Sequence, residues 1–340
     1  MKFIEHSNSV YKSNKKYVSP KAKRIRKITV EATVFLLILF ILIGMLIELI
    51  QNNNTVSILK SSHRLGGYND YRIAYGISGS GSTVVLFESD IGETLLEWNP
   101  IIRNSISGTR MIYYDRFGYG GTDSIKEDSN VKFQSDVLNN LVVNTGYGGP
   151  QILVSEGFGS LIHLEYLKNY TNKVDGIIMI NPVIFSKQST KNYFKEFIEN
   201  MKISFMKLFS TFGIPRLLYK ISISNNPYVK LYKEQAISRN KENYISRMIG
   251  KDYYETVSKE RKLMKKYLKT FDVNNIGTYD MPVVIIESEN NRSVEYEKLV
   301  KSHFINAEIV YFEDTSKFTY TNSEYLSDLI SNINLKIEQK

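Results

Sequence analysis

The chain has 340 residues, enough to bury one large hydrophobic core or two modest ones. It contains no cysteine, which excludes disulfides and thiolate metal sites, and its four histidines are scattered with no pair at metal-ligand spacing. We therefore expect no metal site and no cofactor. The formal net charge of +9 is concentrated in two segments described below, and we expect no nucleic-acid partner.

The N-terminal segment has the pattern of a membrane anchor. Residues 1–28 carry nine Lys or Arg against Glu5, and sixteen consecutive uncharged, mostly apolar residues then run from Ala32 to Ile47. A helix of about 20 residues crosses a hydrocarbon core of roughly 30 Å, and a cationic flank stays on the cytoplasmic side. The sequence predicts a cytoplasmic tail at 1–28, a single transmembrane helix at 29–50 and an extracytoplasmic main domain.

The rival interpretation is a cleaved signal peptide, whose apolar region usually spans about 7–15 residues before a small-residue cleavage site. Here QNNNTVS follows Ile50, with no A-x-A pattern and no cysteine for lipidation. We favour an uncleaved anchor in the cell membrane. Residues 51–68 are polar and are predicted to form a stalk or an irregular lead-in.

The rest of the chain alternates predicted strands with predicted helices. Short apolar runs predict strands at 71–79, 82–89, 109–115, 150–156, 174–182, 281–289 and 307–314, and helical periodicity covers 133–147, 158–170, 293–304 and 323–339. This pattern predicts a mostly parallel sheet with helices on both faces. Residues 187–280 look helical and are too long for a loop, so they are predicted to be an inserted cap between two parts of one core, 69–186 and 281–340.

Three stretches in this order carry a resemblance to a known family. They are VVLFESDIGETLLEWNP, MIYYDRFGYGGTDS and PQILVSEGFGSLIHLEYL. The chain resembles the α/β-hydrolase fold family from about Tyr71 to Pro182 and from Met281 onward, and especially bacterial members with an N-terminal membrane anchor. The resemblance implies an α/β-hydrolase core in which Asp115 and Arg116 tie down the loop after their strand.

Active members of that family mount a nucleophile on a G-x-S-x-G elbow, which projects its hydroxyl above the sheet. The corresponding residues here run from Ser155 to Gly159, and Gly157 stands where the serine is expected. Glycine adopts the required backbone without strain, so the turn can form without the chemistry. The resemblance also assigns the backbone N–H of Phe158 and the loop at Asp90 to the oxyanion hole. Asp90 replaces an expected glycine and puts negative charge where an oxyanion would need stabilisation.

The other two positions of the triad are altered as well. Lys317 stands at the histidine position, and no histidine follows His303. A lysine is mostly protonated at neutral pH, because its unperturbed pKa is about 10.4. Asn290 matches the acid, although Glu287 or Glu289 would substitute if the loop shifted. Conventional serine-hydrolase activity is therefore not expected.

Three functions remain open. The first is a pseudo-hydrolase that binds a ligand or an unknown protein partner. The second is an active ester or amide hydrolase with displaced residues, using Ser155, Ser160 or Thr315 as nucleophile and Glu156 or Lys317 as base. The third is a purely structural envelope protein.

The predicted cap is strongly basic. Residues 187–272 hold nineteen Lys or Arg against eight Asp or Glu. Six of these cations lie in KERKLMKKYLK, at Lys259, Arg261, Lys262, Lys265, Lys266 and Lys269. Such a surface would bind anionic lipid or an anionic envelope polymer, and the alternative is an ordinary solvated helix face.

Overall fold

The computed structural model describes residues 19–125, 129–185, 193–221, 226–235 and 238–339. One sheet has eight strands in the order β1-β2-β4-β3-β5-β6-β7-β8. The first two strands and the β2–β4 pair are antiparallel, and all other neighbours are parallel. The strands are β1 Arg64–Tyr68, β2 Tyr71–Gly79, β3 Thr83–Glu88, β4 Thr109–Tyr114, β5 Gln151–Glu156, β6 Val174–Ile180, β7 Val283–Ser288 and β8 Ala307–Phe312.

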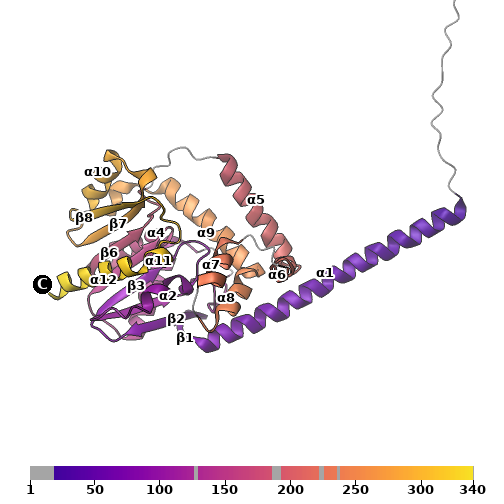
Figure 1. Ribbon diagram of the computed structural model, residues 1–340, viewed down its shortest axis with the longest axis horizontal. Helices are drawn as coiled ribbons and strands as arrows, with labels where there is room; N and C mark the ends of the chain where they lie inside the picture. Colours follow the sequence, from indigo (N-terminus) through magenta and orange to yellow (C-terminus); the bar gives the residue numbers. More distant parts are fainter. Residues whose placement is uncertain (1–18, 126–128, 186–192, 222–225, 236–237, 340) are drawn as a thin grey trace, which may run out of the picture.

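Helices cover both faces of this sheet (Figure 1). Alternate residues of β3 belong to two different apolar clusters, Val84 and Leu86 to one and Val85 and Phe87 to the other. The first cluster includes residues of α3 (Val131–Thr145), α4 (Gly159–Tyr170) and α10 (Val294–His303), and the second includes residues of α2 (Asn99–Ile102), α11 (Phe318–Thr321) and α12 (Ser323–Glu338). Every residue of β3 and β5 is buried. The predicted mostly parallel, doubly covered sheet is confirmed.

The segment between β6 and β7 is helical in its described parts. It contains α5 (Tyr193–Ser210), α6 (Ile214–Lys220), α7 (Pro227–Gln235), α8 (Lys241–Met248) and α9 (Lys251–Thr270). Residues of α7, α8 and α9 form a third apolar cluster with Leu95, Leu96 and Tyr119 of the core loops. This cap cluster joins the insertion to the core above the carboxyl ends of the strands.

Residues 51–68, predicted to form a stalk or an irregular lead-in, are regular in the structure. A single helix, α1, runs from Pro20 to Ser62, and β1 then pairs antiparallel with β2. The polar stretch after Ile50 contains no proline or glycine to end a helix, and Leu59 is fully buried in the cap cluster, so tertiary contacts extend α1. β1, with the sequence RLGGY, is short and contains two glycines, so its composition did not predict a strand. Residues 1–18 of the predicted cytoplasmic tail lie outside the described residues.

Candidate functional site

The strand-to-helix elbow is present at the end of β5. Gly157 has a positive φ of 49°, and its N–H donates to the carbonyl of Ile180 at 2.9 Å. α4 begins two residues later at Gly159. A side chain at position 157 would be strained in this backbone conformation, whereas glycine adopts it freely.

Asp90 fills the space in which a nucleophile would stand. An ideal Cβ built on Gly157 lies 2.2 Å from Cγ of Asp90 and 2.3 Å from its Oδ1. The N–H of Phe158 donates to Oδ1 of Asp90 at 2.7 Å. The carboxylate thus takes both the nucleophile's place and the backbone donor that the resemblance assigns to the oxyanion hole.

Arg116 holds the Asp90 loop in this position. Its guanidinium donates to the carbonyl oxygens of Ser89 at 2.5 Å and of Asp90 at 2.8 Å. It also forms buried ion pairs with Glu88 at 2.8 Å and with Glu260 of α9 at 2.7 Å. One side chain therefore connects β3, the loop after β4 and the cap.

Asp115, the residue before Arg116, is fully buried and holds two further segments in place. Oδ1 accepts the N–H of Leu95 at 2.9 Å, and Oδ2 accepts the hydroxyl of Tyr244, on α8, at 2.9 Å. These contacts, like those of Arg116, position loops and the cap; they are the contacts expected of residues with a structural role.

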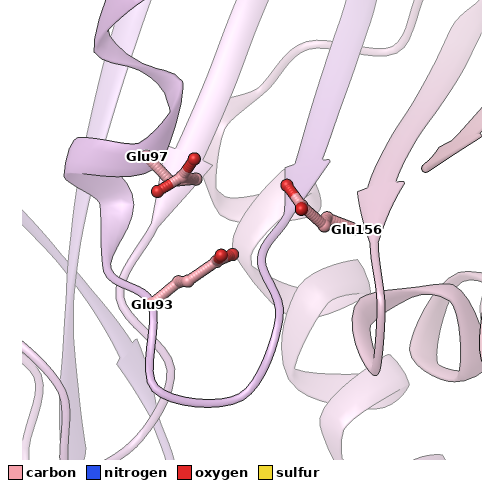
Figure 2. Close-up of side chains that lie close together, drawn as sticks. All are labelled: Glu93, Glu97 and Glu156. Atoms are coloured by element: carbon pink, nitrogen blue, oxygen red, sulfur yellow. The ribbon is translucent and has the colours of Figure 1, made fainter. Parts of the chain in front are cut away.

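Three glutamates meet beside the elbow. Glu93 follows the Asp90 loop, Glu97 lies in the 3-10 helix η1 (Leu95–Trp98), and Glu156 ends β5. Figure 2 shows their carboxylates pointing toward one another, and one oxygen from each lies within 4.8 Å of the others. Oε2 of Glu93 accepts the N–H of Asp90 at 2.8 Å, so this glutamate cluster is joined to the Asp90 loop.

Burial controls the charge of the glutamate cluster. It raises the pKa of Glu97 to about 7, and it raises the pKa of Glu93 and Glu156 well above the usual range. Oε2 of Glu156 is buried and has no hydrogen-bond partner among the described residues. Close, buried carboxylates repel one another, and this repulsion favours uptake of protons or of a cation by the cluster.

Within the described part of the chain, these three carboxylates are close enough together to hold a metal ion. A set of oxygen ligands suits a hard divalent cation. The sequence analysis did not anticipate this grouping. Glu93 and Glu97 are four residues apart, but Glu156 joins them only through the parallel pairing of β3 with β5. The i, i+4 pair was the single local signal, and such pairs are common on solvated helices.

The other two triad positions lie at exposed sites, and the Lys317 ammonium is close enough to Glu97 to oppose the rise in its pKa. Lys317 is exposed, with a positive φ of 57°, at the start of α11. Asn290 is exposed in a 3-10 turn after β7, and its N–H donates to Oγ of Ser288 at 3.4 Å. Glu287 is buried, but its Oε2 accepts the hydroxyl of Tyr296 at 3.0 Å and its Oε1 accepts from Asn291 at 2.9 Å. Among the predicted site residues, the structure brings together Asp90, Gly157 and Phe158, and Arg116 donates to the Asp90 carbonyl.

The displaced nucleophiles considered from the sequence are inaccessible. Ser155 and Ser160 are both 0% exposed, and the hydroxyl of Ser160 donates to the carbonyl of Gly157 at 2.7 Å. Thr315 is also buried. All three hydroxyl groups are thus shielded from solvent in this structure.

Three of the six cations of the predicted basic surface have partners within the protein. On α9, Arg261 forms an ion pair with Glu199 of α5 at 2.9 Å, Lys259 donates to the carbonyl of Ile125 at 3.2 Å, and Lys265 is also partnered. Exposed cations on the same helix are Lys262, Lys266 and Lys269. Binding of an anionic surface by these three lysines remains a prediction.

Surface cavities in the described part of the chain include three that lie away from the elbow. The largest, about 500 Å³, is lined by residues around Tyr147 and Asp175, near the amino ends of β5 and β6. The others, about 300 and 220 Å³, lie against α12 and beside α4. None of the three is lined by Asp90, Gly157, Asn290 or Lys317.

Comparison of the sequence with known proteins finds little similarity. No family model matches the chain. An uncharacterized protein of Schizosaccharomyces pombe is 25% identical over 124 residues, which is 36% of this chain and 23% of that protein. The chain therefore matches less than a quarter of the length of this relative.

Solved structures match over most of their length. The α/β hydrolase MGS-M2 from a Medee basin deep-sea metagenome library has a TM-score of 0.58 at 20% identity, covering 79% of this chain and 96% of the other. Epoxide hydrolase CorEH has a TM-score of 0.58 at 13% identity, covering 81% and 99%. The protein lip1 of Acinetobacter baumannii AYE has a TM-score of 0.62 at 15% identity, covering 85% and 95%. The chain has the α/β-hydrolase fold.

Proposed function

We propose that this chain is a membrane-anchored α/β-hydrolase-fold protein without conventional serine-hydrolase activity, which acts by binding a ligand or a partner. The observation that carries the proposal is the position of the Asp90 carboxylate. It lies where a nucleophile at position 157 would project, and it accepts the N–H of Phe158. A negative charge there repels the oxyanion of acyl transfer.

The altered triad supports the same conclusion. Asn290 and Lys317 are exposed, and the buried serines near the elbow cannot attack a substrate. The fold, by contrast, is complete, and its elbow, sheet and cap are held by buried hydrogen bonds and ion pairs. Retention of the scaffold without the reactive groups favours binding over catalysis.

The anchoring part of the proposal rests on α1. It is the helix, within the described part of the chain, that is long and apolar enough to cross a bilayer. Side chains such as Phe35 and Leu36 are 65% and 61% exposed, as expected of a surface that faces lipid. The same helix packs into the cap beyond Glu48, which supports an uncleaved anchor over a signal peptide. Its basic flank supports a cytoplasmic N-terminus.

A fluorophosphonate probe tests the loss of catalysis. The folded full-length chain, solubilised in detergent, should be labelled no more strongly than the same chain after heat denaturation. Labelling of the wild-type chain, abolished by Ser155→Ala or Ser160→Ala, would overturn the proposal. A fold-matched active serine hydrolase treated in parallel shows that the probe works in the same detergent.

A second candidate is a hydrolase that uses Asp90 as a displaced carboxylate nucleophile. The specific observation in its favour is that the Asp90 carboxyl group occupies the position of an elbow side chain. Attack of the carboxylate on an epoxide carbon would break the ring C–O bond and form an alkyl ester of Asp90, while the ring oxygen takes up a proton. Water would then cleave this ester at the carboxyl carbon, so turnover in ¹⁸O-water should place ¹⁸O in Asp90. Mass spectrometry of the peptide containing Asp90, after incubation with epoxide substrates, decides this alternative.

A further inference from the structure

One surface of the cap is apolar and has no covering element within the described part of the chain. It consists of exposed side chains of α5, of α6 and of the residue that follows α6, and we name it the α5–α6 apolar face: Phe197, Met201, Phe205, Leu208, Leu217 and Ile221. The four residues of α5 recur at spacings of four, four and three, so they lie on one side of the helix. The other side of α5 packs into the cap cluster through Ile203 and Met206.

The turn between α5 and α6 touches α1 within its apolar stretch. An ideal Cβ on Gly44 would lie 2.4 Å from the carbonyl oxygen of Phe212, so glycine is needed for this approach. Gly44 belongs to the uncharged segment that ends at Ile47. At about 1.5 Å per helical residue, the contact lies about 5 Å on the membrane side of Ile47.

A buried ion pair fixes α1 against the cap just beyond this point. Nε of Arg216, on α6, lies 2.5 Å from Oε2 of Glu48, and both side chains are buried. Thr55 and Leu59 are buried farther along α1. The direction of the anchor relative to α5 and α6 is therefore set by specific contacts.

The arrangement of the helices determines which part of the protein faces the membrane. In Figure 1, α5 runs across the direction of α1, and the N-terminal half of α1 projects away from the rest of the fold. A bilayer around the apolar part of α1 would meet α5 and α6 before any part of the sheet.

We infer that the α5–α6 apolar face lies in the lipid–water interface of the membrane that holds α1. This inference rests on the proposed anchoring and goes beyond it, because a single spanning helix alone would leave the domain free to tilt. An amphipathic helix in the interface buries its apolar side about 5–10 Å deep, which fits the level of Gly44. The exposed Lys202 and Lys220 would extend to lipid phosphates.

The absence of cysteine allows a direct test with single-cysteine variants of the full-length chain in lipid vesicles. An environment-sensitive fluorophore is attached at Phe205→Cys or Leu208→Cys. Val143→Cys and Val294→Cys serve as matched controls, because these side chains are similarly exposed, at 58% and 63%, on α3 and α10. Ile41→Cys, inside the apolar part of α1, reports on the anchor itself.

The expected result is quenching of the labels at 205 and 208 by lipids spin-labelled near the headgroup. Their quenching by aqueous iodide should be at least about fivefold weaker than at the control positions. Labels at 205 and 208 that are as open to iodide as the controls, while the label at 41 is lipid-quenched, would overturn the inference and leave the anchor intact. A label at 41 that is also open to iodide would refute the anchoring as well. Protection from iodide without quenching by lipid would mean that a second copy of the chain covers this face, which also contradicts the inference.

Discussion

Oδ1 of Asp90 accepts the backbone N–H of Phe158 at 2.7 Å, and its carboxylate occupies the space next to Gly157. The loop after β3 and the elbow after β5 are thereby joined at the point where hydrolases of this fold carry their reacting groups. Glycine at 157 and aspartate at 90 depend on each other, because any side chain at 157 would collide with the carboxylate.

This dependence predicts the outcome of restoring the nucleophile. Gly157→Ser should lower the free energy of unfolding by about 1–3 kcal/mol, from backbone strain and overlap with Asp90. Adding Asp90→Gly should recover the part that is due to overlap. Thermal unfolding of the full-length variants in detergent measures both effects.

Gly146 provides the matched control for that experiment. It also has a positive φ, 74°, but a Cβ there would meet no atom within 4 Å. Gly146→Ser should therefore show the backbone strain alone, and Asp90→Gly should not relieve it. Equal losses at 157 and 146, with no rescue by Asp90→Gly, would contradict the assigned role of Asp90.

The glutamate cluster predicts a pH-dependent stability. Because burial raises the pKa of Glu97 from 4.5 to about 7, the folded chain keeps a proton that the unfolded chain releases between these values. The contribution is thus fully present below about pH 4.5 and is lost as the pH rises through about 7; it amounts to about 3 kcal/mol. Glu97→Gln should flatten this part of the pH profile in urea unfolding.

An exposed carboxyl group gives the comparison for Glu97. Glu313→Gln changes a solvent-exposed glutamate after β8 and should leave the slope between pH 4.5 and 7 unchanged. An unaltered slope in Glu97→Gln would show that other groups, such as Glu93 or Glu156, carry the whole effect.

Substitution of Arg116 is predicted to be strongly destabilising. Arg116→Met leaves Glu88 and Glu260 buried without their partner and should cost about 3–5 kcal/mol of stability. Arg292→Met, which breaks a half-exposed pair with Glu289, should cost less than about 1 kcal/mol. Chemical denaturation of the two variants tests the difference, and equal losses would refute it.

The ion pair between Arg216 and Glu48, which fixes α1 against the cap, leads to a similar prediction with a different control. Arg216→Met should destabilise the chain by about 3–5 kcal/mol, because it strands the buried carboxylate of Glu48. The double variant Glu48→Met/Arg216→Met should be closer to wild type, since no charge is left unpaired. A double variant less stable than Arg216→Met would show that Glu48 has another essential partner.

Much of the fold could be predicted from local pattern. Seven of the eight strands were expected within a few residues. Central strands such as β3 and β5 are buried on both faces and are therefore continuous apolar runs in the sequence. The eighth, β1, is short and contains Gly66 and Gly67, so its pairing with β2 depends on neighbours rather than on its own composition. The end of α1 was missed for the same reason, because burial of Leu59 in the cap extends a helix that looks polar in sequence.

By itself, the sequence determined the alternation of strands and helices, the apolar segment of α1 and the absence of a hydroxyl at Gly157. These are properties of single residues or of neighbours along the chain. Only the tertiary structure decided that the Asp90 carboxylate fills the elbow, that Glu156 joins Glu93 and Glu97, and that Gly44 admits the turn after α5. Each of these relationships links residues brought together by strand pairing or helix packing, and such contacts leave no periodic signal in the sequence.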